Sequence, residues 1–125
     1  MLRGNGQLIL LVDDEEPVRK VTRYTLEMFG YRVLVANDGA QAAGIYTDSG
    51  QDIDLVLIDM VMPVLDGPKT IQFLKKANPE QRIVGISGKA IDEPFLRDMA
   101  LDAAHFLAKP FDARALLSKV AEVLR

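Results

Sequence analysis

Five short apolar runs alternate with five longer amphipathic stretches along this chain, and this alternation limits the folds that it can adopt. The runs are too short for buried helices and are mostly free of polar residues, as is typical of strands covered on both faces. Repeated strand–helix units predict a parallel α/β sheet with right-handed crossovers. A barrel needs eight such units, so five predict an open sheet. The predicted strands are Leu8–Val12, Arg32–Ala36, Leu55–Ile58, Arg82–Ile86 and Ala104–Leu107.

The stretches between the runs carry the start and stop signals of helices. Gly30 predicts the end of the first helix, Asp38 and Gln41 resemble a capping box for the second, and Asp112 caps the last. The other predicted boundaries are Gly50 after the second helix, Asp66-Gly67-Pro68 and Asn78-Pro79 around the third, and Asp92 and Leu101 around a short fourth. The apolar faces are predicted to contain Val18, Val21, Thr25, Met28 and Phe29 in the first helix, and Leu116, Leu117, Val120, Val123 and Leu124 in the last.

Length and composition exclude several classes of protein. The 125 residues are enough for one domain, and 49% hydrophobic with 26% charged residues is ordinary for a soluble globular chain. No apolar run approaches the roughly 20 residues of a membrane span. Residues 1–7 lack the apolar region of a secretory signal and are predicted to be a tail or linker before a domain at 8–125. The absence of cysteine is compatible with a cytoplasmic location, and the net charge of −3 argues against nucleic-acid binding.

Charged and hydroxyl side chains follow the ends of four predicted strands. Asp13 and Asp14 follow the first, Asp59 the third, Ser87 the fourth and Lys109 the fifth. Ligands of open α/β sheets bind beyond the carboxyl ends of the strands, so these side chains are predicted to meet at one edge. Each alone has an ordinary explanation, such as an aspartate that caps the next helix. Their joint occurrence does not, because three crowded carboxylates repel one another unless a cation joins them.

This set of side chains predicts phosphoryl chemistry. Carboxylate oxygens without cysteine or histidine nearby suit Mg²⁺. Together with a lysine charge and a hydroxyl donor, the ion offers what a phosphoryl group needs. A carboxylate at the centre of such a site can itself be the nucleophile and form an aspartyl phosphate. We therefore predict that Asp59 is presented at the end of its strand in order to be phosphorylated.

Four segments resemble, in the right order and spacing, the receiver domain of two-component response regulators. "LLVDDEE" is similar to the family's acidic pair, "DLVLIDMVMPVLDG" to its phosphorylation segment, "GISGKA" to its Ser/Thr turn and "FLAKPF" to its Lys-Pro turn. The resemblance covers essentially the whole chain. It implies a flavodoxin-like (CheY-like) α/β fold, with a five-stranded parallel sheet of order 2-1-3-4-5 and five helices on its two faces.

The resemblance also implies a role for each site residue. Asp59 would be the phosphoacceptor, Lys109 would pair with the phosphoryl group, and Ser87 and Phe106 would form a two-residue switch. The implied Mg²⁺ ligands are Asp14 directly, Asp13 often through water, Asp59, and the backbone carbonyl of Val61. Pro110 implies a cis peptide bond before it.

The implied partner is a histidine kinase or a histidine phosphotransfer protein, with no direct contact to nucleic acid or membrane. Output would pass through the face formed by the fourth helix, the fifth strand and the fifth helix, where a homodimer could also form. The chain would catalyse its own phosphorylation and dephosphorylation. The identities of Val61 and Lys89 depart from those common in the family, which leaves the lifetime of the phosphorylated state open, and Gly88 could loosen the turn that carries Ser87.

Other assignments fit less well. A flavodoxin would need a neutral phosphate loop where this chain has the acids Asp13 to Glu16, and a haloacid-dehalogenase-type phosphatase would need a second aspartate at Val61. A protein-interaction domain that is not phosphorylated stays open, and the single histidine, His105, has no implied role. The opening segment "GNGQLILLVDDEEPVR" resembles receivers attached to hybrid sensor histidine kinases, which we favour as the parent protein over a DNA-binding regulator or a stand-alone receiver.

Overall fold

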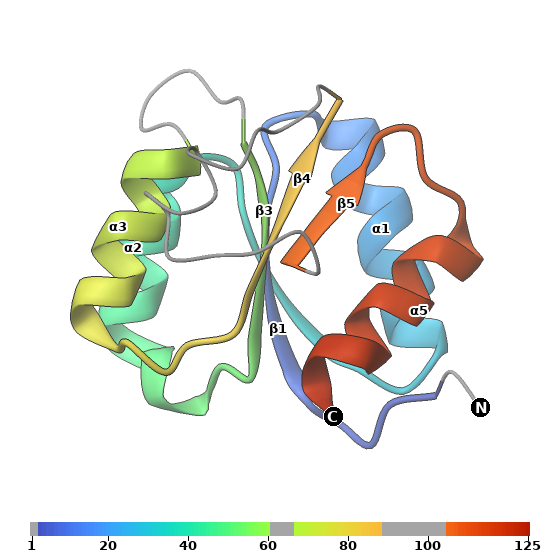
Figure 1. The fold of residues 1–125 in the computed structure, drawn as a ribbon, viewed down its shortest axis with the longest axis horizontal. Coiled ribbons are helices and arrows are strands. Elements are labelled where there is room, and N and C mark those ends of the chain that lie inside the picture. Colours follow the sequence, from blue (N-terminus) through green and yellow to red (C-terminus); the bar gives the residue numbers. More distant parts are fainter. Residues whose placement is uncertain (1–2, 61–66, 89–104) are drawn as a thin grey trace.

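The computed structural model describes residues 3–60, 67–88 and 105–125, and these form a single five-stranded parallel sheet with flanking helices (Figure 1). The strand order is β2-β1-β3-β4-β5, which confirms the predicted fold. The strands are β1 (Leu8–Val12), β2 (Arg32–Ala36), β3 (Leu55–Asp59), β4 (Ile83–Ser87) and β5 (Phe106–Ala108). The helices are α1 (Glu16–Met28), α2 (Gly39–Ser49), α3 (Gly67–Ala77) and α5 (Ala113–Leu124), with a short 3₁₀ helix, η1, at Gly50–Asp52. The helix predicted around 92–101 lies outside the described residues.

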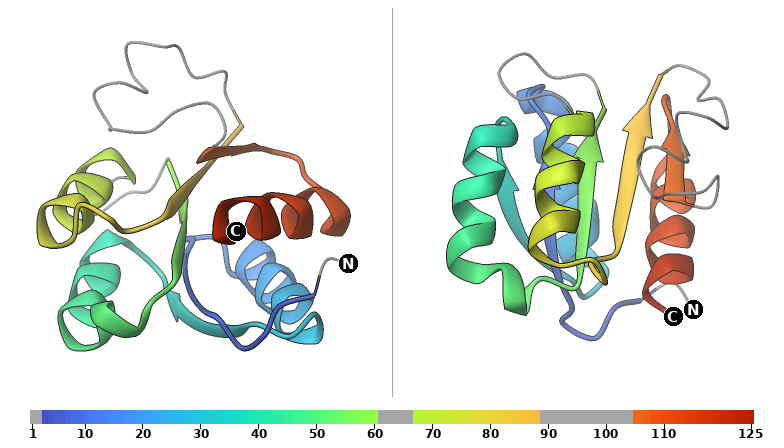
Figure 2. Two further views of the ribbon diagram at one scale, coloured as in Figure 1. Left: turned by 60° about the horizontal axis from the view of Figure 1, so that its bottom comes forward. Right: turned by 60° about the vertical axis from the view of Figure 1, so that its left-hand side comes forward.

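The helices cover the sheet from both sides. Helices α2 and α3 lie on one face, and α1 and α5 lie on the other (Figure 2). Successive residues of a strand point to opposite faces, so Leu10 packs in the core on the α2–α3 side and Leu11 in the core on the α1–α5 side. The chain runs from β1 outward to β2 and then returns to β3 on the other side of β1. This reversal places the crevice of the fold at the carboxyl ends of β1 and β3.

Three strands end one residue later than their apolar runs predicted. Asp59 and Ser87 are the last residues of β3 and β4, whereas the sequence placed both just beyond the strands. Strand β5 ends at Ala108 rather than at Leu107. The reason is that backbone pairing continues past the apolar side chains: the Met60 N–H donates to Ile86 O at 2.9 Å, and the Lys109 N–H donates to Ser87 O at 2.8 Å.

The buried face of α1 differs from the predicted one. Thr22 and Leu26 are its buried residues, whereas Val21 and Met28 are 67% and 55% exposed. At helical spacing Val18, Thr22 and Leu26 share one face, and Val21 and Met28 lie on its flank. The prediction left out Leu26 and counted both flank residues as core, so it was wrong for this helix. The last helix was predicted correctly, since Leu116, Leu117 and Val120 of α5 are buried.

The helix boundaries follow the predicted capping signals. The Gln41 N–H donates to Asp38 Oδ1 at 2.8 Å, and the Ala115 N–H donates to Asp112 Oδ1 at 2.8 Å, which confirms both N-caps. Gly30 has a positive φ of 93°, the left-handed conformation that ends α1 and that glycine adopts readily.

The residues before β1 pack against the turn between α1 and β2. The Gly4 and Gly6 N–H groups donate to Phe29 O and Gly30 O, each at 2.7 Å. A Cβ on Gly4 would lie 2.5 Å from the ring of Tyr31, so this close approach requires glycine. Within the described residues, no helix is long and apolar enough to cross a membrane.

Candidate functional site

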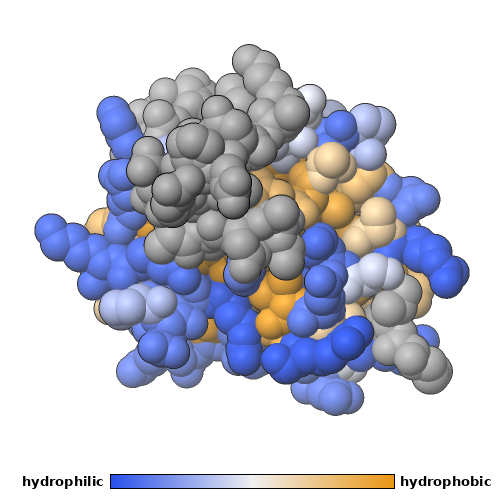
Figure 3. Space-filling model, viewed as in Figure 1, coloured by the Kyte–Doolittle hydropathy of each residue, from blue (hydrophilic) through white to orange (hydrophobic). Residues whose placement is uncertain are grey.

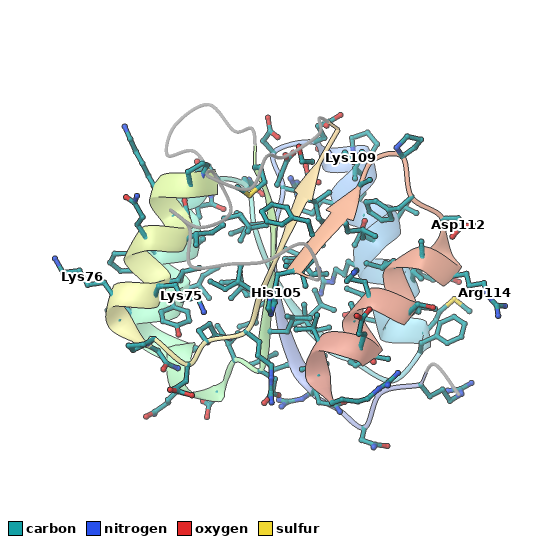
Figure 4. All side chains as sticks on the ribbon, in the orientation of Figure 1. Lys75, Lys76, His105, Lys109, Asp112 and Arg114 are labelled. Carbon is teal, nitrogen blue, oxygen red and sulfur yellow. The ribbon has the colours of Figure 1, made fainter. Side chains whose placement is uncertain are left out.

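The carboxyl ends of the strands bring three of the predicted site residues together. Lys109 Nζ lies 3.3 Å from Asp59 Oδ2 and 3.8 Å from Asp13 Oδ2. Lys109 follows β5 at the edge of the sheet where β4 also ends (Figure 4). The three residues come from β1, β3 and β5 or their first following positions, so the parallel sheet itself aligns them.

Asp59 is held at the centre of the sheet. It is the last residue of β3, which lies between β1 and β4, and it is register partner of Ile86. The residue is only 5% exposed, although a carboxylate is rarely buried without a partner. Lys109 Nζ donates a hydrogen bond to its Oδ2, which supplies one such partner.

Asp13 is buried beside Asp59 and is fixed by its own turn. Its Oδ1 accepts a hydrogen bond from the Glu15 N–H at 2.9 Å, and its carbonyl accepts one from Arg19 at 2.9 Å. Burial raises the pKa of the Asp13 carboxyl above its ordinary value of 3.8, and the nearby Asp59 charge adds to this effect, although the hydrogen bond from Glu15 and the charge of Lys109 oppose it. Asp13 thus carries an unfavourable buried charge.

Four carboxylates gather at this edge. Asp13, Asp14, Glu15 and Asp59 each place one oxygen so that all four oxygens lie within 4.8 Å of one another. Hard oxygen donors at this spacing fit Mg²⁺. The carbonyl of Val61, the remaining predicted ligand, lies outside the described residues. Sequence reasoning missed Glu15, although it belongs to the conspicuous run of four acids from Asp13 to Glu16.

Lys109 is the cation that these acids share within the described residues. Its Nζ donates to Glu15 Oε1 as well as to Asp59 Oδ2, at 3.3 Å each. Burial by itself lowers the pKa of Lys109, but the Asp13 and Asp59 carboxylates outweigh it and raise the pKa above 10.5. Lys109 is therefore fully charged at neutral pH. The peptide bond to Pro110 is cis, as predicted.

The two predicted switch residues lie on β4 and β5. Ser87 is buried at the end of β4, and Phe106 begins β5, where it is half-buried and packs against the core on the α2–α3 side. An added Cβ on Gly88 would meet only Lys109 Cβ, at an ordinary 3.9 Å, so space does not require glycine there. Lys89 lies outside the described residues. His105 is at the other end of β5 from Lys109 (Figure 4).

This arrangement combines a buried carboxylate, a charged lysine and a set of oxygen ligands. The lysine can neutralise an anionic group brought to Asp59, and the flanking acids can hold a divalent cation next to it. A carboxylate at the centre of such a site can act as the nucleophile toward a phosphoryl group.

Comparisons with known proteins point to one family. The sequence profile of the response regulator receiver domain matches residues 9–121. The chain is 38% identical over 117 residues to the sensor kinase CckA of Brucella abortus, covering 93% of this chain and 12% of that protein. It is 33% identical over 117 residues to the transcriptional regulatory protein CpxR of Escherichia coli, covering 94% of this chain and 49% of that protein. A crystal structure of the receiver domain of the hybrid histidine kinase CckA superposes with a TM-score of 0.79 at 32% identity, covering 94% and 99% of the two chains. The chain thus spans half or less of these two full-length relatives.

Proposed function

This chain belongs to the response regulator receiver domain family of two-component systems, and we propose that Asp59 is the residue that accepts the phosphoryl group. One observation carries the assignment: the Asp59 carboxylate is buried at the end of the central strand, with Lys109 Nζ 3.3 Å away and three further carboxylates around it. No other acid among the described residues combines these features.

In the proposed transfer, an oxygen of Asp59 attacks the phosphorus of a phosphohistidine on the partner. An oxygen–phosphorus bond forms while the phosphorus–nitrogen bond breaks, and the imidazole nitrogen leaves with the electron pair. The Lys109 ammonium neutralises charge on the phosphoryl oxygens, and the Ser87 hydroxyl donates a hydrogen bond to one of them. Attack by water on the phosphorus of the aspartyl phosphate breaks the bond to Asp59, which releases inorganic phosphate and returns the free carboxylate.

Receiver domains of this family bind Mg²⁺ at an acidic pocket. We propose that Asp13, Asp14 and Asp59 hold the ion in this chain, and the family resemblance adds the carbonyl of Val61. The bound ion would supply charge neutralisation for the phosphoryl oxygens. Asp13 also positions the turn into α1 through its hydrogen bond with Glu15, which keeps Asp14 at the edge of the site.

Acetyl phosphate with Mg²⁺ tests the acceptor directly. The wild-type chain should gain one phosphoryl group, detected by intact-mass spectrometry, and Asp59→Asn should gain none. Asp48→Asn, which removes an exposed acid of α2, is the matched control and should be labelled like the wild type. Phosphorylation that persists at another residue of Asp59→Asn would contradict the assignment.

The phosphodonor needs a surface next to Asp59, and a groove between α1 and the connection from β5 to α5 provides one. Its volume is about 570 Å³, and Lys109 and Glu15 stand at its site end. Its walls are mainly apolar, and hydrophobic atoms reach the surface in this part of the molecule (Figure 3). Apolar residues then continue along the exposed face of α1 at alternating spacings of four and three, as in a helix-pairing seam. They are Pro17, Val21, Tyr24 and Met28.

We assign this groove to the helix that carries the donor histidine. The support is its continuity with the site, because a histidine that reaches Asp59 brings its own helix over α1. Val21→Lys should slow phosphoryl transfer from an autophosphorylated histidine kinase by about tenfold or more while leaving the reaction with acetyl phosphate unchanged. Phe73→Lys, on the exposed side of α3, is the control and should affect neither reaction. Equal transfer from the kinase to Val21→Lys and to wild type would contradict the assignment.

The proposal for the parent protein rests on the comparisons and on the resemblance of the opening segment. Similarity to CckA fits a hybrid sensor histidine kinase, and similarity to CpxR fits a DNA-binding regulator. We favour the hybrid kinase, and the open reading frame of the full gene decides between the two. We place the phosphoryl transfer in the cytoplasm because such kinases use ATP.

The homodimer through the fourth helix, β5 and α5 also stays a proposal. Sedimentation with and without beryllofluoride tests it.

A further inference from the structure

Phe106 and Met60 meet in a space that exists only because residue 85 is glycine. Gly85 of β4 is the register partner of Phe106 on β5. A Cβ on Gly85 would lie 2.6 Å from Phe106 Cε1 and 2.8 Å from Met60 Sδ. Both distances are shorter than real side chains allow, so the ring edge and the sulfur occupy, side by side, the volume that any other residue at 85 would fill.

Met60 is buried, and its backbone is held by β4 and by the start of α3. It is 5% exposed and belongs to the core on the α2–α3 side of the sheet. Its N–H is bound to Ile86 O. A Cβ on Gly67, the first residue of α3, would lie 2.5 Å from Met60 Cα, so that helix presses directly on the Met60 backbone. Within the described residues, the Phe106 ring edge lies next to the Met60 sulfur at Gly85.

Met60 also follows Asp59 directly in the chain. We propose that Met60 is a positioning residue that couples the state of Asp59 to the position of the Phe106 ring, with Gly85 providing the space for their contact. This inference rests on the proposed function. A phosphoryl group on Asp59 changes the charge and the volume next to the peptide bond between residues 59 and 60. Because the Met60 side chain lies next to the Phe106 ring, a shift of Met60 would move the ring as well. Methionine suits this task because its unbranched thioether keeps contact while it changes shape.

The inferred contact is separate from the Ser87 route. Ser87 lies two residues after Gly85 and therefore on the same face of β4, so both routes end at Phe106. The two ways of coupling Asp59 to Phe106 have different requirements. Coupling through Ser87 requires a hydroxyl that forms a hydrogen bond with the phosphoryl group. Coupling through Met60 requires an apolar side chain at position 60 and no side chain at position 85.

Three variants separate these requirements by NMR with methyl-labelled methionine. In wild type, the Met60 methyl should show a nuclear Overhauser effect to the Phe106 ring, and beryllofluoride with Mg²⁺ should shift signals of residues 106–125. Met60→Ala should bind beryllofluoride with an affinity within about twofold of wild type but show less than about half of these distant shifts. Met60→Leu should restore most of them, because it keeps the apolar volume. Gly85→Ala should remove the methyl–ring contact and expose the ring, with beryllofluoride binding retained.

The outcomes distinguish this inference from the proposed function. A wild-type chain that does not respond to beryllofluoride would overturn both the proposed function and the coupling. The position of the Phe106 ring over Gly85 is tested separately, by the methyl–ring contact measured without beryllofluoride. Absence of that contact would contradict the position of the ring. Full distant shifts in Met60→Ala, with Asp59 still responding, would overturn the coupling alone. Loss of the same shifts in Met60→Ala and Met60→Leu would also overturn it, since bulk at position 60 would then not be what matters.

Discussion

The two ends of the sheet treat polar groups in opposite ways. At the amino end, Tyr46 Oη donates to the buried Gln81 Oε1 at 2.7 Å, and Lys75 Nζ donates to Gln81 O at 2.9 Å. The Asp54 carboxylate is likewise paired with a backbone group, because its Oδ2 accepts a hydrogen bond from the Leu8 N–H at 2.8 Å. None of these hydrogen bonds joins two charged groups.

At the carboxyl end the pairing is unequal. Asp13, Glu15 and Asp59 all lie within 4.0 Å of one cation, Lys109, and Asp14 adds a fourth carboxylate. Like charges brought this close disfavour the folded state, so this end lowers stability. The fold therefore places its unfavourable electrostatics where a bound cation can relieve them, whereas the polar groups named at the opposite end have neutral or hydrogen-bonded partners.

The largest expected effect comes from removing the shared cation. Lys109→Ala should slow phosphorylation by acetyl phosphate roughly 10²–10³-fold, because a preorganised positive group that neutralises the reacting oxygens is worth that much in comparable sites. Rates are measured by mass spectrometry at saturating Mg²⁺. Lys76→Ala, an exposed lysine of α3, is the control and should react like wild type. A Lys109→Ala rate close to that of the control would show that Lys109 serves only to offset the buried acids.

The next effect concerns the metal. Mg²⁺ that binds only the folded state stabilises the wild type by about 2.7 kcal/mol at a hundredfold excess over Kd. Asp14→Ala should lose most of this gain, whereas Asp48→Ala should keep it. The measurement is the thermal unfolding midpoint in chelator and in Mg²⁺. Equal gains for wild type and Asp14→Ala would contradict the ligand set.

A substitution at the amino end of the sheet should lower the stability of the fold but leave phosphorylation unchanged. Gln81→Leu leaves the buried Tyr46 hydroxyl without the acceptor at 2.7 Å and should cost about 1–3 kcal/mol in the free energy of unfolding. Phosphorylation of the folded chain should be unchanged. Denaturant unfolding and acetyl phosphate labelling are measured on the same sample. A loss of labelling equal to that of Lys109→Ala would mean that the two ends are not independent.

Features that depend on a single segment of the chain could be predicted from the sequence. The strands, their parallel order and the acids at their ends follow from short apolar runs and from the family's spaced motifs, and the caps at Asp38 and Asp112 follow from local chemistry. The face of α1 could not be predicted from apolar residues alone, because Thr22 is buried although it is polar.

Contacts between segments were harder still. The space over Gly85 depends on its register with Phe106 and on the place of the Met60 side chain, and neither appears in the sequence of β4. Glu15 was missed for a related reason, since its approach to Lys109 depends on where the connection after β5 brings that lysine. The roles of Asp59, Asp14 and Ser87 stay predictions, which the experiments above test.

The smallest expected effect is at Asp13, and its sign is the most specific. Burial raises the pKa of Asp13, so between its ordinary value of 3.8 and the raised value the folded chain keeps a proton that the unfolded chain has released. Stability therefore falls as the pH rises through that window, and the loss remains at neutral pH. Asp13→Asn cannot ionise and still offers an oxygen to the Glu15 N–H.

In chelator at pH 7, Asp13→Asn should therefore melt higher than wild type by roughly 4 °C, the change that about 1 kcal/mol produces in a domain of this size. The difference should vanish at a pH below the ordinary pKa of the carboxyl, where wild type is also neutral. Mg²⁺ should reduce it, because wild type alone has the full set of carboxylates. Glu16→Gln is the matched control from the same run of acids: Glu16 is exposed, its pKa is lowered by the hydrogen bond and charge of Lys20, and its removal should not raise the melting temperature. If Asp13→Asn melts no higher than wild type in chelator, Lys109 compensates the buried charge in full, and the carboxyl end of the sheet does not lower stability through this residue.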